Sequence, residues 1–236
     1  MNIVFSVVRN SEFVKNKKYK SFFDSLENLN SNTNVIVINS TSEELDEKIT
    51  KNHQVINNAP MGSDLNLYGS ISGLLSQIKP NNDDLILLVD IENIVFTRDP
   101  FSYIQHFDKD LYFYSMNHIS NESEKVKTEY IDFVKTCNFY MGNDFDSYSI
   151  GTHIFGGKCF AFKSILFSLF LNVNRNSANL LTSGAVLSYT HKHINNLYNV
   201  GMLTNQFCKV VTNQNMAESI YGNLDESKKQ YAVIIA

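Results

Sequence analysis

Two carboxylates stand at the end of the most apolar strand that the sequence predicts. Asp90 and Glu92 follow the five apolar residues 85–89, and so continuous an apolar run is typical of a strand covered on both faces. In an extended chain, residues two apart project to the same side, so these carboxylates would repel each other unless a cation lay between them. Oxygen ligands select Mg²⁺ or Mn²⁺, and substrate phosphates commonly complete their coordination. The pair predicts either a metal and diphosphate site or a strand that simply ends in solvated acids.

The elements that must position these acids alternate along the chain. Apolar runs predict strands at residues 3–8, 35–38, 55–56, 85–89, 94–96, 111–114, 154–162, 210–211 and 231–235. Helical spacing or helix-end signals predict helices at residues 13–29, 41–51, 67–78, 122–137, 164–171 and 180–194. The alternation predicts the α/β class: one domain over residues 1–236, with a mostly parallel central sheet and helices on both faces. In such sheets, ligands bind at the carboxyl ends of strands, near a topological switch point.

Charge, hydropathy and cysteine content limit the classes of partner and the compartment that we expect for the protein. The net charge is −4 and no basic run is long enough for a nucleic-acid arm, so nucleic acid is not expected as a partner. No apolar run reaches about 18 residues, so no stable membrane insertion is expected. The three cysteines, Cys137, Cys159 and Cys208, match neither a disulfide framework nor a metal knuckle. Buried, reduced thiols predict a protein of the cytoplasm, or of the host cytoplasm if the source is viral.

The segment from Val89 to Phe101 resembles a pattern of GT-A-fold glycosyltransferases. In that family a strand delivers a D-x-D-type motif, followed by an apolar segment and a D-P-F element; here the motif is Asp90-Ile91-Glu92 and the later element is Asp99-Pro100-Phe101. The helix that contains Tyr68 lies where the family carries a nucleotide- or sugar-facing helix. Residues 151–157 are similar to the N-A-G-hydrophobic-hydrophobic-G-G strand of the sugar or acceptor pocket. The resemblance implies a GT-A-like (Rossmann-like) fold and metal-dependent transfer of a sugar from a nucleotide-diphosphate sugar to a hydroxyl acceptor, such as a glycan.

The resemblance also implies where the donor would bind. Asp90 and Glu92 would hold Mn²⁺ or Mg²⁺, and the ion would hold the diphosphate. Strand ends face the ligand in this architecture, so Arg9, after the first strand, would meet the nucleotide. Ser6 and Val7, within that strand, would border the base.

The remaining candidates concern the sugar and the acceptor. Gly156 and Gly157 would let the sugar or acceptor approach the main chain, although a β-bulge would equally explain two glycines there. Asp144 and Asp146 form a second acidic pair, which is either a solvated turn or the source of the base that an inverting reaction needs. A retaining reaction needs no such base, and the resemblance leans toward it. His153 would contact a phosphate, complete the metal shell or make a plain structural hydrogen bond.

Departures from the family pattern keep two other functions open. The second acid is Glu92 rather than Asp, residues 151–153 replace Asn-Ala-Gly, residues 183–184 replace an Asp-Gln pair, and Ile235 stands where relatives carry a metal-binding His. These changes favour a non-catalytic sugar- or protein-binding domain on the same fold, whereas the intact acids at 90 and 92 weigh against it. A nucleotidyltransferase is the other alternative, but it would be expected to carry a Gly-rich, basic loop after the first strand, and residues 8–12 offer little of that.

Overall fold

Seven strands form the central sheet of the protein. The computed structural model describes residues 1–50, 53–57, 64–115, 150–175, 194, 196–203, 208–210 and 233–235. The strand order is β3-β2-β1-β4-β7-β6-β8, in which β7 runs antiparallel to both of its neighbours and the other pairs are parallel. The strands are β1 (Asn2–Val8), β2 (Thr33–Asn39), β3 (Gln54–Asn57), β4 (Leu85–Asp90), β6 (Leu111–Ser115), β7 (Ile150–Lys158) and β8 (Val200–Leu203). The predicted α/β class with a mostly parallel sheet is confirmed.

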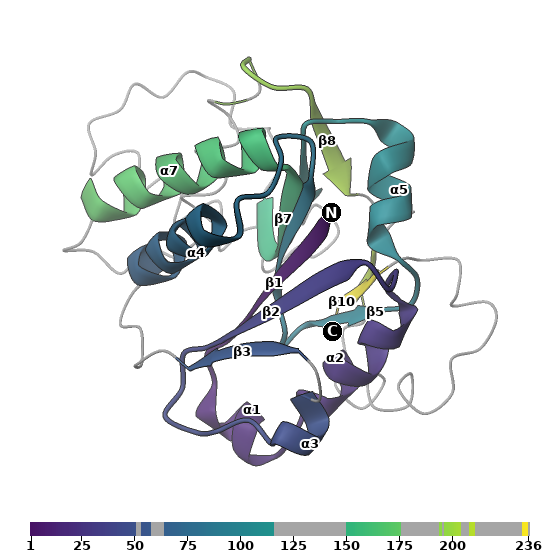
Figure 1. The fold of residues 1–236 in the computed structure, drawn as a ribbon, viewed down its shortest axis with the longest axis vertical. Coiled ribbons are helices and arrows are strands. Elements are labelled where there is room, and N and C mark those ends of the chain that lie inside the picture. The colour runs from purple at the N-terminus through teal and green to yellow at the C-terminus, as the bar shows by residue number, and fades with distance from the viewer. Residues whose placement is uncertain are drawn as a thin grey trace.

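Helices cover both faces of this sheet (Figure 1). On one face, α4 and α7 lie side by side over a buried cluster that includes Ile3, Phe5 and Val7 of β1. On the other face, α1, α2 and α5 pack on a cluster that includes Val4 and Val8 of the same strand. The helices are α1 (Ser11–Lys15), α2 (Lys20–Ser25), η1 (Leu26–Asn28), α3 (Glu47–Thr50), α4 (Asp64–Ile78), α5 (Pro100–Phe107) and α7 (Cys159–Arg175). Alternate side chains of each buried strand therefore feed two separate cores, which explains the continuous apolar runs in the sequence.

A smaller sheet adjoins the segment that follows β4. It joins β5 (Ile94–Phe96) to β10 (Val233–Ile235), antiparallel, and β10 to β9 (Cys208–Val210), parallel. The main chain of Phe96 is also tied to α2 and η1: its N–H donates to Ser25 Oγ at 3.2 Å, and its C=O accepts from Asn28 Nδ2 at 2.9 Å. The turn after β4 is thus anchored to the rest of the fold on two sides.

The order of the strands creates a switch point between β1 and β4. From β1 the chain adds β2 and then β3 outward on one side, and it then crosses back through α4 to place β4 on the other side of β1. The connections that leave β1 and β4 therefore diverge at the carboxyl edge of the sheet, the place where folds of this kind have the crevice that binds ligands. Val7 of β1 is the register partner of Asp90, so the predicted acid stands at this edge.

Two helices are shorter or more broken than the sequence predicts. The helix expected over residues 13–29 is divided into α1, α2 and η1. The break between α1 and α2 falls where the chain passes through a left-handed conformation at Lys17 (φ 51°). The helix expected over residues 41–51 is confined to α3. There the Asp46 side chain accepts the Lys48 N–H at 3.0 Å, while Glu43, expected in the first turn, lies before the helix. In both places, polar side chains and tertiary packing override the helical spacing.

Other boundaries also differ from expectation. The strand expected over residues 154–162 ends at Lys158, and helix α7 begins at Cys159. Helix α5 was not predicted, although Asp99 and Pro100 carry the signal: the Asp99 carboxylate accepts the Phe101 N–H at 3.1 Å, and proline occupies the first turn. The helix predicted at 122–137 lies outside the described residues, as does all of the helix predicted at 180–194 except Ile194.

No helix in the part of the chain that the structure describes is both long and apolar enough to cross a bilayer.

The thiol of Cys159 is expected to be unreactive in the folded protein. Cys159 is fully buried at the start of α7, and burial raises the pKa of its thiol, so the nucleophilic thiolate is scarcer than in a free cysteine. Alkylation by iodoacetamide at pH 8, followed at this residue by peptide mass spectrometry, should be at least about tenfold slower than in urea. Equal rates in the two conditions would contradict the burial.

Candidate functional site

Asp90 and His153 meet at the carboxyl edge of the sheet. Asp90 is the last residue of β4, and the antiparallel pairing of β4 with β7 sets Val89 opposite Ile154. The next residue in each direction brings the imidazole of His153 beside the carboxylate, with His153 Nδ1 4.0 Å from Asp90 Oδ2. The two side chains are 18% and 33% exposed, respectively. The largely buried imidazole of His153 thus faces the carboxylate of Asp90, which is partly exposed and open to a ligand.

The main chain turns directly after Asp90. Residues 91–93 form a turn in which the Asn93 N–H donates to the Asp90 carbonyl at 3.1 Å. The Asp90 carboxylate accepts the Glu92 N–H on one oxygen at 3.1 Å and the Asn93 amide on the other at 2.7 Å. The expectation that Asp90 and Glu92 project to the same side of an extended strand is therefore wrong, because the strand ends at Asp90 and Glu92 lies in the turn that follows. These contacts fix the orientation of the Asp90 carboxylate.

Glu92 reaches the end of the first strand. Its Oε1 accepts the main-chain N–H groups of Arg9 at 2.9 Å and Asn10 at 2.7 Å. Asn10 in turn caps α1, because its side-chain oxygen accepts the N–H groups of Glu12 and Phe13. Glu92 thus ties the turn after β4 to the loop after β1, across the switch point. Its role as a metal ligand stays a prediction; its role in holding this loop was not predicted.

Shortening Glu92 is expected to loosen that loop. Hydrogen bonds to a charged acceptor contribute about 1.5–3 kcal/mol, less where water can replace them, so Glu92→Asp should lower the free energy of unfolding by about 1–2 kcal/mol. Glu92→Gln keeps the length and one acceptor oxygen and should cost less. Glu44→Asp, at an exposed position after β2, is the matched control and should change stability by less than about 0.5 kcal/mol. Urea unfolding measures all three, and equal effects of the Glu92→Asp and Glu44→Asp changes would contradict the contact.

The other residues predicted to bind the donor are mostly buried. Ser6 and Val7 are 0% and 4% exposed within β1, and Tyr68 is 3% exposed in the first turns of α4. The structure places Tyr68 and Val7 in the same buried cluster, beneath the carboxyl edge. Arg9 is exposed at the crevice. Of these four side chains, Arg9 alone lies where a soluble ligand would reach it without a rearrangement of the core.

The packing of the sheet itself explains why residues 156 and 157 are glycines. They lie near the C-terminal end of β7, opposite Leu87 and Ile86, away from the carboxyl edge where Asp90 lies. A Cβ on Gly156 would come within 2.0 Å of the Ile86 carbonyl oxygen, and one on Gly157, where φ is +149°, within 2.1 Å of the Asp110 carbonyl oxygen. The close approach of neighbouring strands requires both glycines. Their proposed contact with a sugar is not needed to explain them.

Asp144 and Asp146, the candidate bases, lie outside the described residues, as do residues 183–184. Nothing about their geometry enters the site described above.

The residues at the carboxyl edge fit a divalent ion in part. Among the described residues, no three His, Cys, Asp or Glu side chains gather into a cluster that could hold a metal. The Asp90 carboxylate is partly exposed, and each of its oxygens keeps lone-pair capacity beyond its one hydrogen bond. Nδ1 of His153 is buried without a hydrogen-bond partner among the described residues. A carboxylate and an imidazole nitrogen are both metal ligands, and substrate phosphates or water commonly supply the remaining positions.

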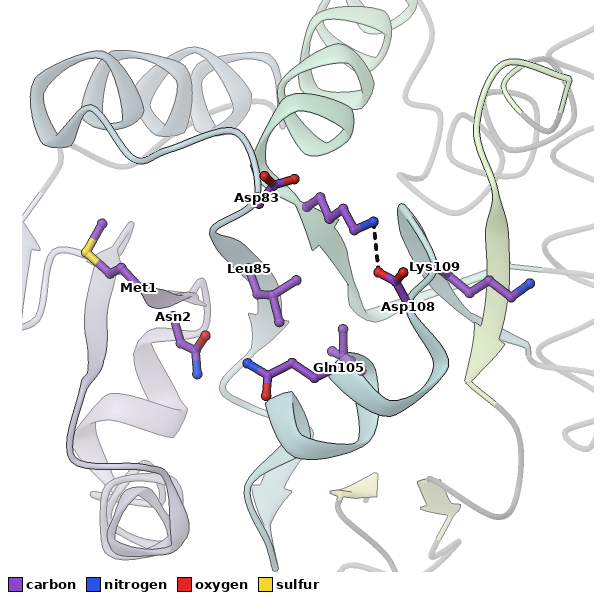
Figure 2. A pocket seen from close by; sticks show the side chains of 9 residues that line it. Met1, Asn2, Asp83, Leu85, Gln105, Asp108 and Lys109 are labelled. Atoms are coloured by element: carbon purple, nitrogen blue, oxygen red, sulfur yellow. Dashed lines mark ion pairs between the residues drawn. The ribbon is translucent and has the colours of Figure 1, made fainter.

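A well-defined hollow lies at the opposite edge of the sheet. The hollow has a volume of about 280 Å³ and lies at the amino ends of β1 and β4; Figure 2 shows the side chains that line it. Its charged lining includes Asp83, Asp108 and Lys109, and Lys158 Nζ pairs with Asp108 at 2.9 Å and Asp110 at 3.2 Å. These contacts raise the pKa of Lys158, mainly through its hydrogen bond to Asp108, and leave its charge already satisfied by the protein. The cavity contains none of the residues that the sequence singled out.

The strand order and the helices on both faces of the sheet define an α/β fold that matches solved glycosyltransferases of the GT-A fold. Among solved structures, the chain is similar to the galactosyltransferase LgtC in complex with donor and acceptor sugar analogs, with a TM-score of 0.53 and 13% sequence identity over 100% of this chain and 86% of that one. It is similar to an active-site mutant of LgtC with the same TM-score, 12% identity and the same coverage. No family model matches the sequence, and no curated protein matches it.

Proposed function

We propose that the protein transfers a sugar from a nucleotide-diphosphate sugar to a hydroxyl-bearing acceptor, such as a glycan. The observation that carries the proposal is the placement of Asp90, a partly exposed and oriented carboxylate, at the switch point between β1 and β4. The similarity of the fold to LgtC, whose structure holds donor and acceptor sugar analogs, supports the same chemistry for this protein.

The residues around the crevice have separate roles in this proposal. Asp90 binds Mn²⁺ or Mg²⁺, and a bound ion would neutralise the charge that develops on the departing diphosphate. Glu92 holds the main chain of Arg9 and Asn10 in place, so that the loop after β1 is already formed when the nucleotide binds. Arg9 is exposed directly after β1, and its guanidinium binds phosphate or ribose oxygens. Val7 and Tyr68 support the loop after β1 from the buried cluster beneath α4, and Ser6 lies buried beside Val7 in the strand.

The roles that we propose for acceptor-binding residues are based on the sequence. If the reaction inverts the anomeric centre, Asp144 or Asp146 removes the acceptor proton. We favour a retaining reaction, which needs no such base.

The identity of the released nucleotide tests the proposal. The purified chain would be incubated with Mn²⁺ and with uridine, guanosine and adenosine diphosphate sugars in turn, with water and simple glycosides as acceptors. A sugar transferase releases a nucleoside diphosphate from at least one donor. Pyrophosphate formed from a nucleoside triphosphate and a sugar phosphate would indicate a nucleotidyltransferase instead. Binding of a sugar nucleotide or glycan without any turnover would indicate a non-catalytic domain and would contradict the proposal.

A further inference from the structure

An imidazole nitrogen at the edge of the sheet is buried without a partner. Nδ1 of His153 makes no hydrogen bond to any residue that the structure describes. A buried polar group left in this state costs about 1–3 kcal/mol, which a protein rarely accepts without a use for the group. The Asp90 carboxylate, on the neighbouring strand, faces this nitrogen and can bind a metal ion.

The spacing between the two groups fits a bridging ion better than a direct hydrogen bond. His153 Nδ1 and Asp90 Oδ2 are 4.0 Å apart, whereas an N–H···O hydrogen bond spans about 2.7–3.2 Å. Bonds from a divalent ion to nitrogen or oxygen are about 2.0–2.2 Å long, so two ligands of one ion can stand up to about 4.4 Å apart. The observed separation falls inside that limit.

We infer that Asp90 and His153 are the two protein ligands of the divalent ion. His153 thus replaces the ligands that the family pattern would place at positions 92 and 235. The inference rests on the proposed function, since the ion is the one that would bind the donor diphosphate. Glu92 is directed toward the main chain of Arg9 and Asn10, and Ile235 has no ligand atom in its side chain. His153 stands where the related pattern has a glycine.

The surroundings hold both ligands in position. His153 lies within β7, paired with β4, and its ring stands 6.3 Å from the ring of Tyr114 between centroids. The Asp90 carboxylate is oriented by the Asn93 amide and the Glu92 N–H. Ligands on adjacent strands are held more rigidly than ligands on loops, so the spacing of the pair is largely set before an ion binds.

An imidazole ligand changes which ion the site prefers. Mg²⁺ favours an all-oxygen shell, whereas nitrogen ligands favour transition metals. We therefore expect Mn²⁺ to bind at least about tenfold more tightly than Mg²⁺. The preference should fall when the imidazole is replaced by an amide.

Electron paramagnetic resonance of the whole chain with Mn²⁺ tests the inference directly. The probes are Mn²⁺ alone and Mn²⁺ with inorganic pyrophosphate, which supplies a diphosphate without committing to a base or a sugar. The spin-echo spectrum of the wild type should show modulation from a directly bound ¹⁴N nucleus. His153→Gln should lose this modulation and bind Mn²⁺ at least about tenfold more weakly. His106→Gln, at an exposed position on α5, is the matched control and should keep both.

The outcomes separate this inference from the proposed function. Mn²⁺ bound without nitrogen modulation in the wild type would overturn the role of His153, while release of a nucleoside diphosphate from a donor would still support the transferase. Nitrogen modulation that survives in His153→Gln would also overturn it, because another histidine would then be the ligand. A circular-dichroism melt without metal checks that the His153→Gln chain folds. If the His153→Gln chain does not fold, the spin-echo spectrum is measured on His153→Asn instead.

Discussion

Asp90→Asn is expected to lower the rate of nucleoside-diphosphate release at least about 100-fold. The change keeps the size of the side chain but removes the negative charge that the proposed ion requires. It also leaves an oxygen to accept the Glu92 N–H, so the turn over residues 90–93 should persist. The loss should therefore appear in turnover and in metal affinity, and not in the folding of the chain.

The matched control for this change lies just before the other end of the same strand. Asp83→Asn alters an exposed carboxylate just before β4, at the opposite edge of the sheet and in the lining of the cavity in Figure 2. Turnover by this variant should stay within about twofold of the wild type, since a surface change of this kind has little effect. Release of the nucleotide is followed by a coupled assay at saturating Mn²⁺. If Asp83→Asn abolished release and Asp90→Asn did not, the site would lie at the amino ends of the strands and the account given above would be wrong.

Gly156→Ala is expected to destabilise the fold by more than about 3 kcal/mol. The added Cβ would lie 2.0 Å from the Ile86 carbonyl oxygen and 2.9 Å from Leu87 Cα. Both are main-chain atoms of β4, so no side chain can turn away to relieve the contact, and the two strands would have to separate. Because Asp90 lies three residues further along that strand, the same distortion should reach the candidate site.

Gly73→Ala provides the contrast. Gly73 lies in the middle of α4, and apart from its chain neighbours and the main chain of its own helix, no atom comes within 4 Å of the position that its Cβ would take. Alanine in a helix interior is favoured over glycine by about 0.5–1 kcal/mol, so this variant should be more stable than the wild type. Urea unfolding of the two variants measures the difference. A Gly156→Ala protein as stable as Gly73→Ala would show that β4 and β7 are not packed as described.

The sequence predicts strands of this fold better than helices, for a physical reason. A strand buried on both faces needs a continuous apolar run, and β1, β2 and β4 each have one. The helices near the N-terminus are set by local polar contacts, such as the cap that Asp46 gives to α3, and helical spacing does not record them. The antiparallel direction of β7 depends on which strand it pairs with, and residue spacing along one strand carries no information on that partner.

Part of the candidate site could likewise be predicted from the sequence, and part of it could not. That Asp90 would lie at the carboxyl edge followed from its place after an apolar strand. That Glu92 would bind the main chain of Arg9 did not, because the two residues are 83 positions apart and the contact exists only once β1 and β4 pair. The approach of His153 to Asp90 likewise depends on the register between β4 and β7. Both misses concern contacts that the fold makes between distant segments.

Thermal unfolding of the wild-type chain with nucleotide-diphosphate sugars, with and without Mn²⁺, is the most direct test of the central claim. A ligand at about 100 times its dissociation constant stabilises the native state by about 2.7 kcal/mol, and each kcal/mol raises the melting temperature of a chain of this size by about 2–4 °C. We predict a rise of about 5–10 °C with at least one donor, present only with Mn²⁺ and absent in Asp90→Asn. If no donor raised the melting temperature in either condition, the protein would not bind nucleotide-diphosphate sugars, and its GT-A-like fold would serve another purpose.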